Sequence, residues 1–165
     1  GSMVVADIGD SHTDVGIINE EGIVSAYNLD IGSMTLTNRI VKTIENIYNL
    51  NITYNTAEKL KKSIASLYAY DKSKMAISGR DIITGTAKNV EVSSSDIYED
   101  AIYCYKRIIK VLEGLLVVAP LECIEGIARR GLFLLGGGSK IKGLEDFIFD
   151  TLSLPVVFID ILFYN

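Results

Sequence analysis

Two glycine-bearing turns contain the residues best suited to chemistry. The first, residues 7–14, reads Asp-Ile-Gly-Asp-Ser-His-Thr-Asp and separates two apolar stretches. Glycine tolerates backbone conformations that let consecutive N–H groups point at an anion such as a phosphate. Asp7, at the end of the first apolar stretch, could hold the hydration shell of a Mg²⁺ ion that neutralises the same phosphate. A polar hairpin turn without a ligand is the alternative interpretation.

The second turn, residues 134–144, reads Leu-Leu-Gly-Gly-Gly-Ser-Lys-Ile-Lys-Gly-Leu. Its three consecutive glycines follow an apolar strand and precede a predicted helix, so the backbone could pass close to a ligand near a helix N-terminus. A purely structural strand-to-helix turn remains the alternative. The spacing matches neither the Gly-x4-Gly-Lys-Ser/Thr phosphate loop nor the G-x-G-x-x-G dinucleotide pattern, which excludes both motifs.

The segments around these turns predict alternating strands and helices. Apolar runs bounded by turn-forming residues predict strands at residues 3–8, 15–18, 23–31, 131–135 and 156–159. Apolar residues at helical spacing predict helices at residues 36–47, 55–68, 96–117 and 143–152, and Pro120 is expected in the first turn of a further short helix. Two short strands around a turn at residues 78–81, and an edge strand at 89–92, complete a more polar stretch.

This order predicts an α/β fold with a mixed five-stranded sheet and helices packed on it. Residues 1–33 and 96–165 would form the sheet-containing lobe, and residues 34–95 a small inserted α+β lobe. A helix after the last strand would be expected to cover the remaining sheet face. Since the sequence shows none, an apolar surface is expected to be covered by something else.

Composition restricts the class of protein. The 165 residues are 48% hydrophobic and 22% charged, which excludes global disorder, and the net charge of -5 argues against a nucleic-acid-binding protein. The absence of a run of five basic residues argues against docking on an anionic membrane. Cys104 and Cys123 lie in predicted helices and are interpreted as buried thiols, as in a reducing cytoplasm.

Both turns resemble motifs of the actin-like ATPase superfamily. Asp7-Ile8-Gly9 with Thr13-Asp14 is similar to its second phosphate motif, and residues 134–144 are similar to its adenosine motif. Within the superfamily, the chain is most similar to the bacterial actin homologues of the MreB family. That similarity is carried by residues 48–50, 56–58, 79–85, 90–94, 143–144 and 154–156.

The resemblance covers only the C-terminal half, or domain II, of such a protein. It implies a ribonuclease-H-like lobe (subdomain IIA) with a small insert (subdomain IIB). The N-terminal domain and its own phosphate motif have no counterpart in the sequence. We therefore expect ATPase activity only when that domain is joined, and no activity from the isolated chain.

The resemblance also implies a role for individual residues towards ATP and Mg²⁺. Asp7 would hold Mg²⁺ through water, and His12 stands where relatives usually have a threonine that orients the attacking water. Nucleotide contacts are implied for Gly9, Asp10, Ser11, Thr13, Glu58, Lys61, Gly136, Gly137 and Gly138. For Glu58 and Lys61, one helical turn apart near the ribose and adenine, a solvated helix face is the alternative.

The function implied is that of an ATP-binding, filament-forming cytoskeletal protein that determines cell shape. Expected partners are further copies in a protofilament and membrane-anchored rod-complex adaptors. Direct membrane contact from this half and nucleic-acid binding are not expected, and the location is expected to be cytoplasmic. Two alternatives remain: a scaffold of the same fold that does not hydrolyse ATP, and half of another ATPase or kinase of the superfamily.

Overall fold

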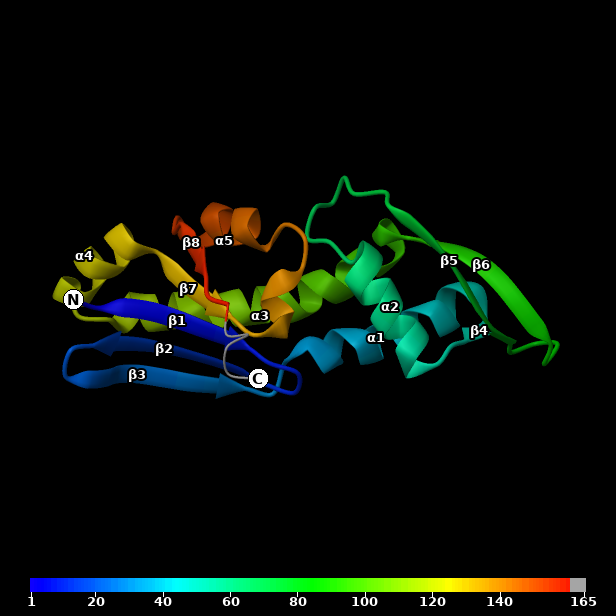
Figure 1. Ribbon diagram of the computed structural model, residues 1–165, viewed down its shortest axis with the longest axis horizontal. Helices are drawn as coiled ribbons and strands as arrows, with labels where there is room; N and C mark the ends of the chain where they lie inside the picture. Colours follow the sequence, from blue (N-terminus) through cyan, green and yellow to red (C-terminus); the bar gives the residue numbers. More distant parts are fainter. Residues whose placement is uncertain (161–165) are drawn as a thin grey trace. The chain divides into compact units, whose positions relative to one another are not determined.

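The computed structural model describes residues 1–160, which form two compact units (Figure 1). Unit 1 contains residues 1–33 and the described chain from Tyr105 onward, and unit 2 contains Met34–Cys104. Helix α3 (Ser94–Val118) contributes to both. The second boundary therefore lies inside this helix, whereas the sequence interpretation placed it at residue 96, near the start of the helix.

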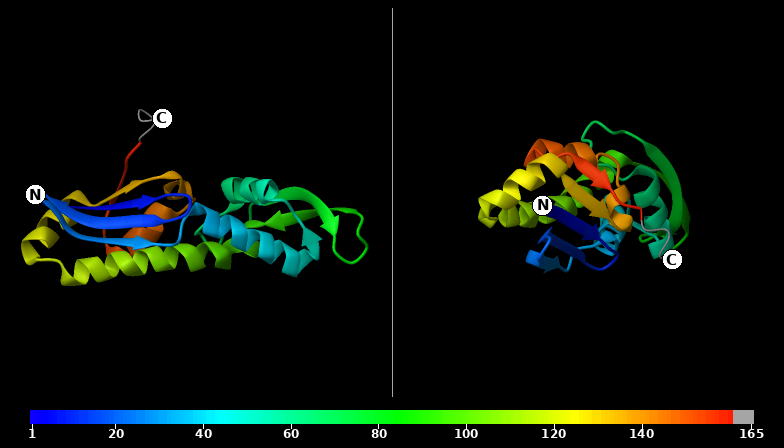
Figure 2. Two further views of the ribbon diagram at one scale, coloured as in Figure 1. Left: turned by 90° about the horizontal axis from the view of Figure 1, so that it is seen from below. Right: turned by 60° about the vertical axis from the view of Figure 1, so that its left-hand side comes forward.

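Unit 1 is built on a five-stranded mixed sheet, which Figure 2 shows from two further directions. In spatial order its strands are β3 (Gly22–Leu29), β2 (Thr13–Asn19), β1 (Met3–Ile8), β7 (Leu132–Leu135) and β8 (Val156–Phe158). The first three pair antiparallel, whereas β7 pairs parallel to both β1 and β8. The predicted mixed five-stranded sheet is confirmed.

Helices supply the rest of the core of unit 1. The C-terminal part of α3 buries Ile108, Leu112 and Leu115, which recur at helical spacing and therefore share one face. The other helical elements are α4 (Leu121–Arg130), the 3-10 helix η1 (Gly137–Lys140) and α5 (Leu144–Leu152). Strand β1 alternates buried and half-buried residues, so one of its faces lies in the core.

Unit 2 combines helices with a second, three-stranded sheet. Its elements are α1 (Ser33–Tyr48), β4 (Leu50–Asn51), α2 (Tyr54–Ile64), β5 (Lys74–Asp81), β6 (Ala87–Ser93) and the start of α3. The strands lie in the order β4-β5-β6 and all pair antiparallel. Leu36, Ile40 and Ile44 form the buried stripe of α1 that their spacing predicts.

The hairpin of unit 2 corrects one sequence prediction. Residues 78–81 were expected to form a turn, but they lie within β5, which pairs continuously with β6 from Lys74↔Ser93 to Arg80↔Ala87. The turn follows at residues 82–86, where the Asp81 carboxylate accepts the backbone N–H of Ile83 at 2.8 Å. Gly79 permits close packing rather than a turn, because a Cβ there would collide with the Asn51 carbonyl oxygen and lie 3.0 Å from Leu50 Cγ.

Helix α2 also differs from its prediction. Its N-cap is Thr53, whose Oγ1 accepts the N–H of Thr56 at 3.1 Å, rather than Asn55 or Thr56. The helix ends at Ile64 and not at residue 68, although Leu67 is still buried. Both cysteines are buried free thiols, as predicted. Among the described residues, no helix has the length and apolar character needed to cross a membrane.

Asp100, on α3 in unit 2, is a buried carboxylate whose charge should affect stability. Its side chain is only 8% exposed, accepts the Thr43 hydroxyl at 2.5 Å and pairs with Arg39 Nε at 3.2 Å. Burial raises the pKa of Asp100 above its ordinary value of 3.8, and the bonds from Thr43 and Arg39 only partly oppose this. The folded state therefore binds this proton more tightly than the unfolded chain does.

We expect the resulting stabilisation to be complete below pH 3.8 and lost as the pH rises through the folded-state pKa. Asp100→Asn removes the titration and keeps an oxygen for Thr43. The free energy of unfolding of the native chain, minus that of Asp100→Asn, should fall as the pH rises from about 3.5 to 7. Urea denaturation across this range measures it, with the exposed Asp150→Asn as a control. Parallel curves for native chain and Asp100→Asn would contradict the raised pKa.

Candidate functional site

The two glycine-bearing turns meet at one end of the sheet in unit 1. Strands β1 and β7 run parallel, and the register places Asp7 beside Leu135. Segments that follow neighbouring parallel strands leave the sheet at the same end, where the carboxyl ends of the strands lie. A Cβ added to Gly136 would lie only 2.6 Å from Asp7 Oδ1, so the second turn passes directly against this carboxylate. The predicted convergence of the two turns is confirmed.

In the second turn, Gly136 and Gly138 are packed against Ile8, whereas Gly137 has open space beside it. Gly136 has φ +89°, and a Cβ there would collide with the Ile8 carbonyl oxygen. A Cβ on Gly138 would collide with the Ile8 side chain, whereas one on Gly137 would meet nothing within 4 Å. The Tyr105 hydroxyl donates to the Gly138 carbonyl at 2.5 Å and fixes the turn to α3. Gly137 is therefore the position at which a ligand could approach the backbone.

The first turn presents its polar side chains to solvent. Asp10, Ser11 and His12 are exposed, and Ser11 Oγ lies 3.2 Å from His12 Nδ1. The turn is closed by a hydrogen bond from the Gly9 N–H to the His12 carbonyl at 3.0 Å. Thr13 differs from its neighbours, since it is fully buried and its hydroxyl donates to the Ile31 carbonyl at 2.7 Å. Its side chain thus connects β2 to the chain that follows β3.

Gly32 packs closely against the backbone of the first turn. Its residue type and position alone did not indicate this contact. A Cβ at Gly32 would lie 2.6 Å from both the Gly9 carbonyl oxygen and the Asp10 carbonyl carbon. The next residue, Ser33, donates its N–H to the Gly9 carbonyl at 2.8 Å. The signal in the sequence was a glycine between a predicted strand and a predicted helix. Tyr105 was also missed, because its helical spacing indicated only a core position.

Glu58 and Lys61 lie on α2 in unit 2 and bond to each other. Lys61 Nζ donates to Glu58 Oε1 at 2.6 Å, and the same oxygen accepts the Thr37 hydroxyl at 2.5 Å. Burial acts to raise the pKa of Glu58, but the bonds from Lys61 and Thr37 outweigh it, and the pKa is lowered. The carboxylate is therefore held in its charged form. The ribose and adenine contacts implied for the two residues stay predictions.

The donor groups of the first turn suit Mg²⁺ only in combination with a ligand. Asp7 is half-buried, and Asp10 and Asp14 are exposed nearby in the sequence. In the described part of the chain, no group of three or more His, Cys, Asp or Glu side chains could hold a metal ion alone. Mg²⁺ usually keeps several waters and binds through one or two carboxylates together with substrate phosphates. Asp7 therefore fits a water-mediated Mg²⁺ contact, not a complete protein site.

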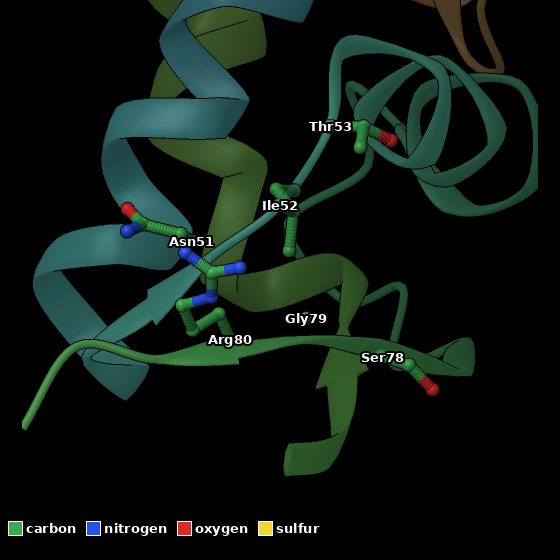
Figure 3. Close-up of a pocket in the computed structure, with 6 residues that line it drawn as sticks. All are labelled: Asn51, Ile52, Thr53, Ser78, Gly79 and Arg80. Atoms are coloured by element: carbon green, nitrogen blue, oxygen red, sulfur yellow. The ribbon is translucent and has the colours of Figure 1, made fainter. Parts of the chain in front are cut away.

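Unit 2 contains a separate hollow beside β4 and β5. It has a volume of about 300 Å³ and is lined by Asn51, Ile52, Thr53, Ser78, Gly79 and Arg80. Figure 3 shows the Arg80 side chain extending towards Asn51, its partner across the β4–β5 pair. None of the residues singled out in the sequence for nucleotide contacts lines this hollow. We assign it no part in the candidate site.

Curated cell shape-determining proteins align in sequence with nearly the whole chain. The Mbl protein of Bacillus subtilis (strain 168), a cell shape-determining protein, is 28% identical over 158 residues, covering 95% of this chain and 47% of that protein. The cell shape-determining protein MreB of Escherichia coli (strain K12) is 30% identical, covering 95% of this chain and 45% of that protein. The chain thus spans about half the length of the curated relatives it matches.

Solved structures and a family model agree. MreB5 of Spiroplasma citri bound to ADP matches with a TM-score of 0.90 and 32% identity, covering 96% of this chain and 49% of that one. The MamK double helical filament matches with a TM-score of 0.79 at 20% identity, over 96% and 49%, which shows likeness of fold alone. The predicted actin-like fold is confirmed. Because the model described as MreB/Mbl protein matches residues 1–161, the chain belongs to the MreB/Mbl family.

Proposed function

We propose that this chain forms one wall of an ATP site in a filament-forming protein that determines cell shape. The observation that carries the proposal is the meeting of the two turns, with Gly136 against the Asp7 carboxylate. Family membership supports it, because Spiroplasma citri MreB5 binds ADP and AMPPNP, and the curated relatives are cell shape-determining proteins. MamK, which shares the fold, forms a double helical filament, and this supports self-association.

The two turns would divide the contacts with the nucleotide. Residues 136–138 would pass against the α-phosphate and adenine, with Gly137 nearest because no side chain or backbone blocks it. Gly9, Asp10 and Ser11 would line the β- and γ-phosphates. Thr13 would hold the turn beneath them, since its hydroxyl already donates to Ile31. The side chains of Asp10, Ser11 and His12 in the first turn are exposed and can adjust to the ligand.

Asp7 would hold Mg²⁺ through water, and the ion would neutralise charge on the phosphates. Neutralisation by a cation is especially important here, because residues 1–33 contain six side-chain carboxylates and no Lys or Arg. Without a cation, phosphates beside Asp7 and Asp10 would be repelled. Asp7 is half-buried at the end of β1, which limits its movement and keeps the water-mediated contact in one place.

We expect no ATP hydrolysis by this chain alone. Phosphoryl transfer depends on positioning and charge neutralisation around the whole phosphate chain, so one wall is insufficient. A scaffold that binds nucleotide without turnover is the second candidate function. It is favoured by His12, an exposed imidazole that contacts Ser11 at the position where relatives place a water-orienting threonine. A cytoplasmic location and contact with rod-complex adaptors remain proposals that rest on the family alone.

The test is a titration of the ¹⁵N-labelled chain with ATP, in Mg²⁺ and then in EDTA, followed by NMR. Amide signals of residues 9–13 and 136–138 should shift, and binding should be weak. Asp7→Asn should lower the affinity about tenfold in Mg²⁺, whereas in EDTA it should raise the affinity slightly, because it removes a charge that repels the phosphates. Asp150→Asn, which changes the net charge equally on an exposed helix position, should bind like the native chain. Shifts confined to other residues, or an Asp7→Asn affinity unchanged in Mg²⁺, would contradict the site.

A further inference from the structure

Strand β3 is an exposed edge of the sheet in unit 1. It pairs only with β2, so the backbone groups on its other side have no strand partner in the described chain (Figure 1). None of its eight residues is buried. Three large apolar side chains are exposed, with Ile23 74%, Val24 38% and Tyr27 62% accessible. An eight-residue edge of this kind can pair with a further strand.

Two usual protections of an edge strand, charged side chains and proline, are absent from β3. Its sequence, Gly-Ile-Val-Ser-Ala-Tyr-Asn-Leu, contains no charged residue and no proline. The register with β2 shifts between Ile17 and Ile18 and leaves Val24 without an opposite residue. From Ser25 to Leu29 the pairing is regular, so this part offers an even row of backbone donors and acceptors. This regular, uncharged part of the edge is suited to a partner strand.

The charge around β3 selects the kind of partner. Glu21 precedes the strand and Asp30 follows it, and neither carboxylate has a bonded partner among residues 1–160. Glu20, at the same turn as Glu21, is ion-paired with the amine of Gly1, which lies 2.6 Å from its Oε1. Two copies joined through this edge would bring like charges together, whereas a segment with lysine or arginine at its ends would meet opposite charges.

We propose that β3 binds an extended, basic segment of a partner protein as an added strand of the sheet. The backbone of the segment would pair with residues 25–29. Its apolar side chains would cover Tyr27 and Ile23, and its basic residues would lie near Glu21 and Asp30. This interaction needs neither nucleotide nor the second wall of the ATP site, so it stands or falls independently of the proposed function.

The probe is a capped, fluorescent peptide of about nine residues that alternates valine and threonine between lysines at both ends. Fluorescence anisotropy should show saturable binding that weakens as salt is raised, because the carboxylates are exposed. Hydrogen exchange by NMR should slow at alternate amides of residues 25–29, those that point away from β2. A peptide with glutamate for lysine, and one with two central prolines, should each bind at least about tenfold more weakly.

Matched variants distinguish peptide binding at β3 from nonspecific binding to exposed apolar residues. Tyr27→Lys puts a cation on the edge and should weaken binding about tenfold. Val117→Lys makes the same charge change at an apolar residue of unit 1 that is 78% exposed, and it should bind like the native chain. Thermal unfolding of both variants shows that the fold is retained. Replacing Glu21 and Asp30 by their amides should remove most of the salt dependence.

Several results would overturn the proposal. Equal binding of the glutamate peptide would remove the charge argument, and unchanged exchange across residues 25–29 would exclude strand addition. Equal weakening by Val117→Lys and Tyr27→Lys would show that binding is not at the edge. If sedimentation instead showed a dimer of the native chain that Tyr27→Lys dissociates, the occupant of β3 would be a second copy and not a basic segment.

Discussion

Gly136→Ala is expected to lower the free energy of unfolding by about 3 kcal/mol. Gly136 has φ +89°, a conformation that alanine adopts only with strain. Its new Cβ would also collide with the Ile8 carbonyl oxygen and lie 2.6 Å from Asp7 Oδ1. Because the Ile8 backbone and the Asp7 side chain cannot both move away from the new Cβ, the second turn should be displaced from the end of β1. Urea denaturation measures the loss.

The neighbouring Gly137→Ala is the matched control. A Cβ there meets nothing within 4 Å, so the free energy of unfolding should change by less than about 0.5 kcal/mol. If Gly137 is also the closest approach to the nucleotide, its added methyl group should still weaken ATP binding in the NMR titration. A stable Gly136→Ala, or equal losses for both variants, would show that the two turns do not pack as described.

The second large effect is expected for Gly32→Ala, with a loss of about 2 kcal/mol. The new Cβ would lie 2.6 Å from Gly9 and Asp10 backbone atoms, which belong to the first turn. Relief requires that turn or the start of α1 to shift, and the Ser33 N–H bond to the Gly9 carbonyl should break. Amide signals of residues 9–13 should therefore move in the variant without any ligand.

Gly114→Ala provides the opposite expectation in the same unit. Gly114 lies in the exposed part of α3 and its added Cβ meets nothing, so helix propensity should raise stability by about 0.5 to 1 kcal/mol. Thermal unfolding of Gly32→Ala and Gly114→Ala side by side separates steric conflict from the general effect of replacing glycine. A Gly32→Ala variant as stable as the native chain, with unchanged signals at residues 9–13, would contradict the support of the turn by Gly32.

Local patterns were sufficient for most elements of the fold. The strands of unit 1 follow from apolar runs bounded by turn-forming residues, and the buried stripe of α1 follows from helical spacing. The pattern failed at residues 78–81, where Gly79 suggested a turn. There the glycine permits close contact with β4, the strand of Leu50 and Asn51, which is distant in the chain and cannot be detected from neighbouring residues.

The candidate site divides in the same way. Asp7 and the glycines at 136–138 could be found from residue type, since few side chains permit a backbone to approach an anion. The supporting residues could not, because Gly32 and Tyr105 act on the turns through contacts with Asp10 and Gly138 that depend on how distant segments pack. Thr13 was predicted as a phosphate contact, and only the structure revealed its buried bond to Ile31.

The order of strands and helices, the two glycine-bearing turns and the family resemblance could all be read from the amino-acid sequence. Each of these depends on residue type and short-range spacing. The packing of Gly136 against Asp7, the contact of Gly32 with the first turn and the position of β3 at an edge without a further strand among residues 1–160 became visible only in three dimensions. Such relations depend on the parallel pairing of β1 with β7, strands separated by more than a hundred residues, and on the close packing of backbones where no side chain intervenes.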